Sequence, residues 1–368
     1  MSEVETMQSN LEPLAEIPIS PEVAALPKAD LHLHQEVWPR RERLAARREG
    51  RVPFDWAGHA RRVMAETPAG HERLVGIYQP DRHLDVRAAP EGDPEVLIAR
   101  IAEQLEEGAA DGAVLLEIRF GSSDIDTYPD FMTLFREAER RVQRRFPRLR
   151  AEAIAYLNLG PDEAVLRLAE RRLEACLAAA AQGLGGVDFR VDPYDQEPDP
   201  ALWAIAYRDA ERAAGAGLGI TVHAAEFSPA ALAVALEVPH LKRIGHGVHA
   251  AGEGRFMDTL VRYGVTVECC LTSNVVLGAV PSYEEHPIKR LVEAGVPTTL
   301  NTDLPVHACT SIGREYAVAA ALRFSTRELL EFTRHAVRAS FTGAERRRAL
   351  LDELDHGAAD RPASPGAR

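Results

Sequence analysis

The run ADLHLH at residues 29–34 alternates apolar and polar side chains and ends with two histidines, His32 and His34. Side chains alternate between the two faces of a β-strand, so both imidazoles would lie on one face and Leu33 on the other. The pattern therefore predicts a strand that presents two potential metal ligands side by side. A single His-x-His pair is weak evidence for a metal site, so its meaning depends on what other strands bring to it.

Seven further runs have the length and residue types of β-strands, and helical patterns separate most of them. These runs occupy residues 113–120, 151–158, 186–192, 218–224, 241–247, 265–271 and 297–303. Eight strands that alternate with helices over about 270 residues match the size and strand count of a (β/α)8 TIM barrel. The alternative is a doubly wound open sheet, but the chain lacks a phosphate-binding fingerprint for it. We therefore predict an α/β fold of the barrel type.

The interval between the first two predicted strands is much longer than one helix requires. We interpret residues 36–110 as a helical insertion after the first strand, folded over one end of the barrel as a substrate lid. No linker or charge block divides the remainder, so we expect a single barrel domain over residues 23–355. Residues 1–22 and 356–368 are polar or rich in Pro, Gly and Ala, and we expect flexible ends there.

The composition excludes several classes of function. Charged residues make up 27% and hydrophobic residues 46% of the 368 residues, which is typical of a soluble globular protein. The net charge of −13 argues against nucleic-acid polymers and anionic membranes as partners. No apolar run approaches the roughly 18 residues of a membrane span, and the acidic N-terminus does not resemble a signal peptide. We expect a cytoplasmic protein with a small-molecule substrate; the sequence leaves open a homo-oligomer.

Other predicted strands also end in side chains that can bind metals or transfer protons. His223 ends the fifth strand, Glu226 follows it by three residues, and His246 and Asp303 lie at the ends of the sixth and eighth strands. The carboxyl ends of barrel strands meet at one rim, where barrel enzymes place their active sites. We therefore predict a metal-dependent active site from these residues together with the two histidines of the first strand.

The ligand types favour one zinc ion. Three histidines and a carboxylate without a nearby thiolate fit Zn²⁺ with an open position for water. Binuclear barrel hydrolases usually bridge two metals with a carbamylated lysine on a middle strand. The chain has only Lys28, Lys242 and Lys289, and none of them lies in the fourth predicted strand. We expect one Zn²⁺ per chain.

Taken together, the motifs resemble those of the adenosine deaminase family of amidohydrolases. The motifs are, in order, LPKADLHLHQE, LLEIRF, VHAAE, RIGHG, CLTSN and LNTDLP, from Leu26 to Pro305. The resemblance implies a (β/α)8 barrel with extra helices after the first strand. It also implies that zinc is bound by His32, His34, His223 and Asp303.

The same resemblance implies the catalytic roles. Asp303 would also orient the bound water, and His246 would hold the hydroxide and assist its deprotonation. Glu226 would protonate a ring nitrogen of the substrate while hydroxide adds to the carbon that bears the amine. A carboxylic acid beside an apolar ring can have a raised pKa, which suits a proton donor.

The residues expected to face substrate depart from the family pattern. Leu304 replaces a second aspartate that normally bonds the five-membered ring of a purine, and Arg190 and Val191 replace an alanine-glycine pair. Glu36 is retained at the position that meets a ribose hydroxyl. We therefore predict substrate contacts by Glu36, Val191 and Leu304, in a hydrolytic deaminase of an amino-heterocycle. The substrate would be purine-like or a modified nucleoside and not plain adenosine.

Two other functions stay open at this point. One is a mononuclear zinc hydrolase of an amide, lactam or cyclic imidate, and the other is a barrel that binds a ligand without catalysis. The sequence does not decide whether Trp38, Arg190 or His307 contacts substrate.

The remaining polar residues receive structural interpretations. We expect Glu117 and Arg119 to form a buried pair, and Ser273 and Asn274 to shape a loop after the seventh strand. We expect a solvated helix face from Arg40 to Arg51. We expect surface positions for His249, His286 and His307.

Overall fold

The computed structural model describes residues 11–15, 17–35, 46, 49–82 and 93–359. The predictions for Glu36 and Trp38, and most of the stretch from Arg40 to Arg51, fall outside the described residues. Within the described part of the chain, no helix is long and apolar enough to cross a membrane.

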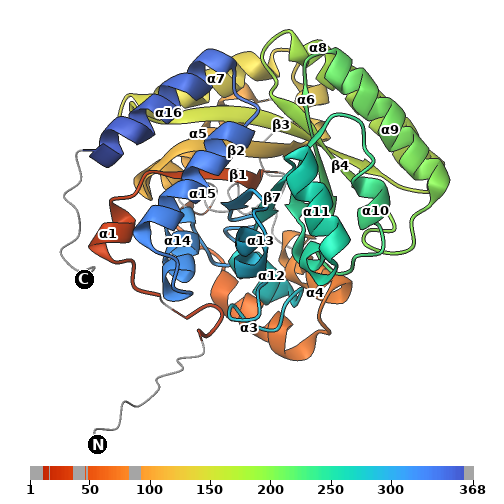
Figure 1. The fold of residues 1–368 in the computed structure, drawn as a ribbon. Coiled ribbons are helices and arrows are strands. Elements are labelled where there is room, and N and C mark those ends of the chain that lie inside the picture. Colours follow the sequence, from red (N-terminus) through yellow and green to blue (C-terminus); the bar gives the residue numbers. More distant parts are fainter. Residues whose placement is uncertain (1–10, 16, 36–45, 47–48, 83–92, 360–368) are drawn as a thin grey trace, which may run out of the picture.

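Eight parallel strands form one sheet in the order of the sequence, and the sheet curves into a barrel (Figure 1). They are β1 (Lys28–His34), β2 (Ala113–Gly121), β3 (Arg150–Leu159), β4 (Gly186–Val191), β5 (Gly219–Ala224), β6 (Leu241–His246), β7 (Thr266–Cys269) and β8 (Thr298–Leu300). The N–H of Asp303 donates to the carbonyl of His32 over 2.7 Å, and the N–H of His34 donates to the carbonyl of Asp303 over 3.1 Å. The segment after β8 thereby pairs with β1 and closes the barrel. The predicted (β/α)8 fold is confirmed.

Helices follow the strands and cover the outside of the barrel (Figure 1). In the described part of the chain they are α1 (Pro21–Ala24), α3 (Trp56–Glu66), α4 (His71–Ile77), η1 (Gln79–Arg82), α5 (Pro94–Ala110), α6 (Ser122–Thr127), α7 (Phe131–Gln143), α8 (Glu163–Ala180), α9 (Pro200–Gly215), α10 (Leu232–Ala235), η3 (Val248–Gly252), α11 (Gly254–Tyr263), α12 (Leu271–Leu277), α13 (Ile288–Glu293), α14 (Ile312–Ala321), α15 (Thr326–Ala339) and α16 (Ala344–Ala359). Asp93, Asp162 and Asp199 precede α5, α8 and α9. Their carboxylates accept hydrogen bonds from N–H groups that a helix start leaves free.

Alternation along the strands separates an apolar outer face from a polar interior. On β4, Val187, Phe189 and Val191 belong to the hydrophobic core between the barrel and its helices. Asp188 and Arg190 alternate with them, so they lie on the face toward the barrel axis. Charged side chains from several strands therefore share the interior of the barrel.

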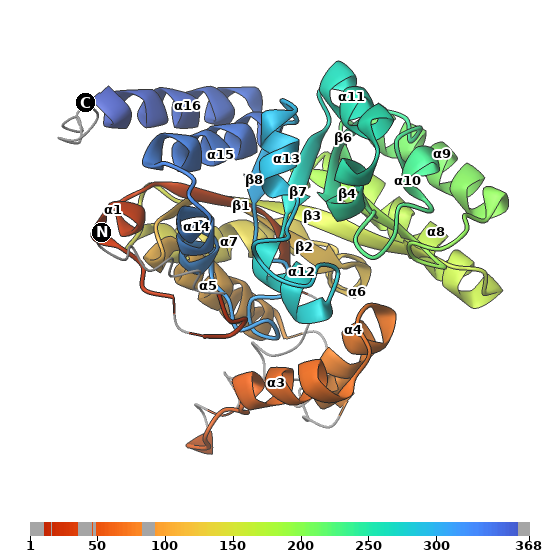
Figure 2. The same cartoon turned by 60° about the horizontal axis from the view of Figure 1, so that its bottom comes forward.

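The inserted segment is shorter than predicted. α5 packs against α7 and contributes Ile98 and Ile101 to the main core, so it is the regular outer helix between β1 and β2. The insertion ends before α5 and includes α3 and α4, which lie together on one side of the barrel (Figure 2). At the other end of the chain, α16 continues to Ala359, so the expected boundary at residue 355 falls inside a helix.

A separate apolar cluster, which we call the lid cluster, joins the insertion to the barrel. It contains Ala60, Val63, Ile77, Val276, Leu277, Leu304 and Ala308. Val276 and Leu277 belong to α12, which starts where β7 ends, and Leu304 follows β8. The insertion therefore packs over the carboxyl ends of the strands.

Candidate active site

Three imidazoles and one carboxylate gather at the carboxyl ends of β1, β5 and β8. The Nε2 atom of His34 lies 3.2 Å from Nε2 of His32 and 3.2 Å from Nε2 of His223. Oδ1 of Asp303 lies 3.6 Å from Nε2 of His32 and 3.5 Å from Nε2 of His34. All four side chains are buried. The donor atoms of His32, His34 and Asp303 lie within 4.8 Å of one another, a spacing that could hold a metal ion, and Nε2 of His223 adjoins them.

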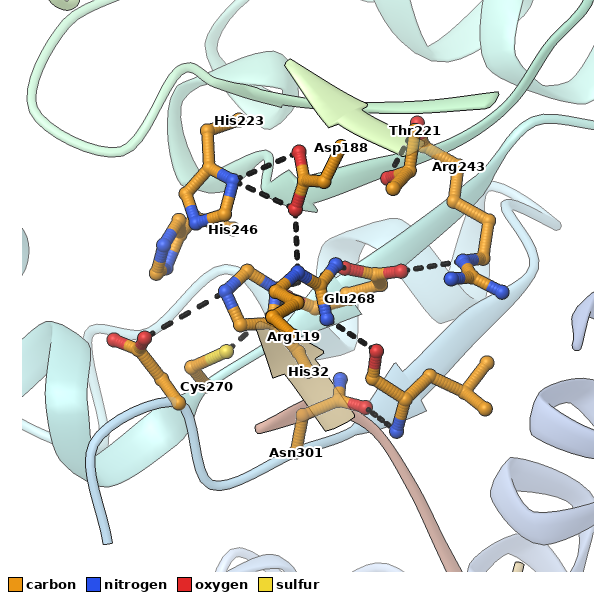
Figure 3. A network of polar contacts seen from close by, with 12 residues as sticks. His32, Arg119, Asp188, Thr221, His223, Arg243, His246, Glu268, Cys270 and Asn301 are labelled. Carbon is orange, nitrogen blue, oxygen red and sulfur yellow. Dashed lines mark hydrogen bonds and ion pairs between the residues drawn. The ribbon is translucent and has the colours of Figure 1, made fainter. Parts of the chain in front are cut away.

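The other ring nitrogen of two of these histidines faces a carboxylate. Nδ1 of His32 lies 2.7 Å from Oε2 of Glu268, and Nδ1 of His223 lies 2.9 Å from Oδ2 of Asp188 (Figure 3). A carboxylate accepts a hydrogen bond from Nδ1–H, which keeps the ring proton on Nδ1 and leaves the lone pair on Nε2 for a metal. The pattern is that of metal-binding histidines oriented by acidic partners.

Arg119 lies between these two acids inside the barrel (Figure 3). Its Nη2 atom is 2.6 Å from Oε2 of Glu268, and its Nε donates to Asp188. Although burial opposes ionisation, interactions with His223 and Arg119 hold the pKa of Asp188 well below its usual range. Asp188 is therefore an anion at neutral pH, which suits its contact with His223.

The expected pair between Glu117 and Arg119 is not what the structure shows. Both residues are buried, but Glu117 forms its ion pair with Nη2 of Arg243 at 2.8 Å, and Arg119 pairs with Asp188 and Glu268. The reason is geometric, because residues two apart on one strand point the same way and reach different strands across the barrel. Arg119 thus supports the histidine cluster.

Glu226 is held by a turn that Asp195 organises. The carboxylate of Asp195 accepts hydrogen bonds from the backbone N–H groups of Ala225, Glu226 and Phe227, over 2.7, 2.7 and 2.8 Å. These three contacts fix the turn that follows β5. The Glu226 side chain is consequently placed beside the histidine cluster with only 3% of the residue exposed.

The two oxygens of Glu226 have different surroundings. The hydroxyl of Tyr194 donates to Oε2 over 3.0 Å, whereas Oε1 is buried and has no hydrogen-bond partner among the described residues. Burial raises the pKa of Glu226 well above the usual value of a glutamate, and the charges of Asp303 and Asp195 act in the same direction. A protonated Glu226 would therefore carry its proton on Oε1, where it is free to be donated.

His246 lies between Glu226 and Asp303 but contacts different partners from the other histidines. Its Nε2 is 3.7 Å from Oε2 of Glu226, and its Nδ1 is 3.2 Å from Nδ2 of Asn274. Ser273 donates from Oγ to Oδ2 of Asp303 over 2.5 Å. The prediction that Ser273 and Asn274 shape a loop was wrong, because both residues belong to a helix. Both lie on α12 and contact site residues.

Two histidines expected at the surface are buried instead. His286 is 4% exposed and contacts Asn274, and His307 is fully buried. The ring of His307 packs against Trp56 and Tyr78, with centroid distances of 4.7 and 4.9 Å. The burial of His307 follows from the insertion, because α3 and the segment after α4 cover this residue, which comes after β8. His249 is half-buried.

The residues predicted to contact substrate lie in different surroundings. Val191 points into the core between β4 and the helices, so its position gives no support to a contact with substrate. Its neighbour Arg190 lies on the interior face, and its guanidinium lies 4.6 Å from the ring centroid of Tyr194. Leu304 is 3% exposed within the lid cluster. Glu36 lies outside the described residues.

The residues that sequence reasoning missed are partners of the predicted ones. They are Asp188, Tyr194, Asp195, Glu268, Asn274 and His286. A signal existed for Asp188 and Glu268, because each is an acid alternating with apolar residues inside a predicted strand. Nothing comparable indicates the other four, whose partners lie on different elements.

The sequence model of one protein family, described as adenosine deaminase, matches residues 27–357. The chain is also 31% identical to an aminodeoxyfutalosine deaminase of Streptomyces coelicolor, over 94% of this chain and 89% of that protein. The chain belongs to the adenosine deaminase family. An adenine deaminase of Rhizobium leguminosarum is more similar locally, with 44% identity over 141 residues. That match covers only 38% of this chain and 44% of the relative.

Solved structures show the same fold as this adenosine deaminase family member. An adenine deaminase from Arthrobacter aurescens superimposes with a TM-score of 0.71 at 22% identity, over 91% of this chain and 100% of that chain. An amidohydrolase from Burkholderia ambifaria with bound Zn superimposes with a TM-score of 0.64 at 18% identity, over 94% and 96% of the two chains. The (β/α)8 barrel is thus the fold that these proteins share.

Proposed function

We propose that the protein is a zinc-dependent hydrolytic deaminase that acts on a purine-like amino-heterocycle or a modified nucleoside, in preference to adenosine. The observation that carries this proposal is the buried Oε1 of Glu226, which has no hydrogen-bond partner among the described residues and lies beside the cluster of His32, His34, His223 and Asp303. A proton donor next to a metal-type ligand set is what deamination of a ring amidine requires. Protonation of the ring nitrogen makes the adjacent carbon electrophilic while water attacks it.

The donor set supports zinc as the metal. Nε2 of His32, His34 and His223 together with Oδ1 of Asp303 would hold one Zn²⁺, and three imidazoles with a carboxylate suit this ion. When bound, zinc lowers the pKa of water to about 7. None of the three lysines is placed to bridge two metals, because Lys242 and Lys289 are exposed and Lys28 Nζ donates to the carbonyls of Ala24 and Leu26. One ion is therefore proposed. The Zn-bound amidohydrolase of the same fold agrees with this proposal.

The residues around the ligand set would have different roles in proton transfer and in positioning the reactants. Glu226 delivers its proton from Oε1 to the ring nitrogen, and Tyr194 keeps Oε2 occupied so that only one oxygen is available. His246 directs Nε2 toward the space between Glu226 and Asp303, where the attacking oxygen would lie. Ser273 fixes the orientation of Asp303 through Oδ2. After attack, the carbon loses ammonia and the ring keeps the oxygen.

The surroundings of Leu304 support a substrate other than adenosine. Leu304 lies in an apolar cluster, so it offers no acceptor or donor to the five-membered ring of a purine nucleoside. A ring nitrogen left unpaired there loses about 1–3 kcal/mol, or roughly 5- to 150-fold in binding of the transition state. The relatives named for adenine and aminodeoxyfutalosine indicate which amines to try first.

The test is release of ammonia by the zinc-loaded protein from adenine, aminodeoxyfutalosine and adenosine under matched conditions. We expect one of the first two, which the names of the relatives suggest, to exceed adenosine in kcat/KM. If adenosine is the best substrate, the specificity proposal is wrong. If no amine releases ammonia while the protein hydrolyses lactams or cyclic imidates, the deaminase proposal itself is wrong.

A further inference from the structure

A chain of hydrogen bonds runs from the backbone amide of Ile288, the first residue of α13, to the ring of His246. Its first link is the N–H of Ile288, which donates to Nδ1 of His286 over 3.2 Å. A backbone amide can only donate, so Nδ1 of His286 must be the acceptor. His286 is buried, and burial lowers its pKa to about 3. The ring is therefore neutral and carries its single proton on Nε2.

The second link is the side-chain amide of Asn274, which accepts a hydrogen bond from His286 and donates one to His246. Nε2 of His286 lies 3.2 Å from Oδ1 of Asn274, and Nδ2 of Asn274 lies 3.2 Å from Nδ1 of His246. The proton on His286 requires the carbonyl oxygen of Asn274 on its side. An amide rotated by 180° would place two donors against each other, so the orientation of Asn274 is fixed. Asn274 is fully buried, which leaves water no access to break the chain.

The consequence for His246 is opposite to that for the predicted metal ligands. Nδ1 of His246 receives a hydrogen bond from an amide, so the neutral ring carries its proton on Nε2. His32 and His223 instead direct Nδ1 at the carboxylates of Glu268 and Asp188, which leaves their Nε2 lone pairs free. His246 is close enough to these residues to be counted as a ligand by distance alone. Its partner excludes that role in the neutral ring.

We propose that Asn274 and His286 are positioning residues that hold His246 in the tautomer with the proton on Nε2. In this state His246 donates a hydrogen bond to the oxygen that attacks the substrate, and it cannot accept a proton at the same atom. This chain of hydrogen bonds, which we call the relay, therefore gives His246 a different role from the three other histidines of the site. It directs the Nε2 proton of His246 at the attacking oxygen. The inference rests on the proposed function for its catalytic meaning, but the tautomer itself is independent of that function.

The direct test is nitrogen NMR of zinc-loaded protein labelled with ¹⁵N-histidine, with His246 assigned by its absence from His246→Gln. We expect the spectrum of a neutral ring protonated on Nε2. In Asn274→Asp, the carboxylate still accepts from His286 but now also accepts from His246, so the proton should move to Nδ1. A wild-type His246 protonated on Nδ1 would overturn the proposal whether or not the protein deaminates anything.

Kinetics of the same variants supply the second readout. We expect Asn274→Asp to lower kcat by about 10²- to 10³-fold with KM changed less than threefold and zinc content unchanged, because a donor to the reacting oxygen is lost. His286→Gln can both accept from Ile288 and donate to Asn274, so it should retain kcat within about fivefold. His286→Met cannot, and it should lose about tenfold or more. Equal kcat values for the Gln and Met variants would contradict the relay, and this pair decides the matter if Asn274→Asp fails to fold.

Discussion

At the residue scale, the function proposed here depends on which oxygen of Glu226 carries a proton. Tyr194 occupies Oε2, and Oε1 is left without a partner among the described residues. Glu226→Gln keeps the size and the contact with Tyr194 but cannot deliver a proton. We expect kcat to fall by about 10²- to 10⁴-fold, with zinc content and thermal stability close to wild type. Ammonia release and metal analysis check this, and a variant with more than a tenth of the wild-type kcat would rule out Glu226 as the acid.

A second prediction at the residue scale concerns Asp195 and the turn that it holds. Both of its oxygens accept backbone N–H groups from the turn that carries Glu226, so an amide in its place would direct N–H at N–H. We expect Asp195→Asn to lower the free energy of unfolding by about 1–3 kcal/mol and to reduce kcat. Denaturant unfolding with activity measurements tests both.

Asp199→Asn is the matched control for this change. Asp199 also accepts a backbone N–H, but at the start of α9, where aspartate and asparagine serve almost equally. We expect less than about 0.5 kcal/mol of change there. If the two variants lose the same stability, Asp195 has no special part in holding the turn.

At the element scale, the insertion depends on a few apolar contacts with the barrel. Leu304 connects the segment after β8 to residues of α3, α4 and α12 in the lid cluster. Leu304→Ala should remove about 2–5 kcal/mol of packing and act mainly on the insertion. We expect amide exchange in residues 56–77 to become about tenfold faster or more, with β1 to β8 unchanged.

Leu322→Ala provides the comparison, because Leu322 is also buried but packs in the main core at the end of α14. The Leu322→Ala substitution should not change the rate of amide exchange in residues 56–77. Should both variants accelerate exchange in the same segments, Leu304 would not be what holds the insertion to the barrel.

The strands and the clustering of the histidines with Asp303 could be predicted because they depend on local periodicity. Alternation in β1 places His32 and His34 on one face, and the carboxyl ends of parallel strands must meet. The same alternation indicates that Val191 faces away from the interior, a reading that the prediction missed. The alternation also marks Asp188 and Glu268, but their pairing with His223 and His32 was not predictable, since Glu268 lies 236 residues from His32 and only the closed barrel brings them together.

At the scale of the whole molecule, the proposed metal connects the first strand of the barrel to the segment after the last strand. His32 and His34 belong to the first strand, and Asp303 follows the last. A metal bound in the folded state only, at a thousandfold excess over its Kd, adds about 4 kcal/mol of stability. We expect removal of zinc by a chelator to lower Tm by at least about 5 °C and to abolish activity, with both restored by added zinc. An unchanged Tm after complete metal removal would argue against a site that closes the barrel.

The account as a whole depends on water replacing an amine on a ring carbon. The most direct measurement is turnover of the best amine substrate in H₂¹⁸O, with mass spectrometry of the product and quantitation of ammonia. We predict one ¹⁸O atom in the product and one ammonia released for each turnover. Ammonia without incorporated ¹⁸O, or a ring-opened product that keeps its nitrogen, would contradict hydrolytic deamination.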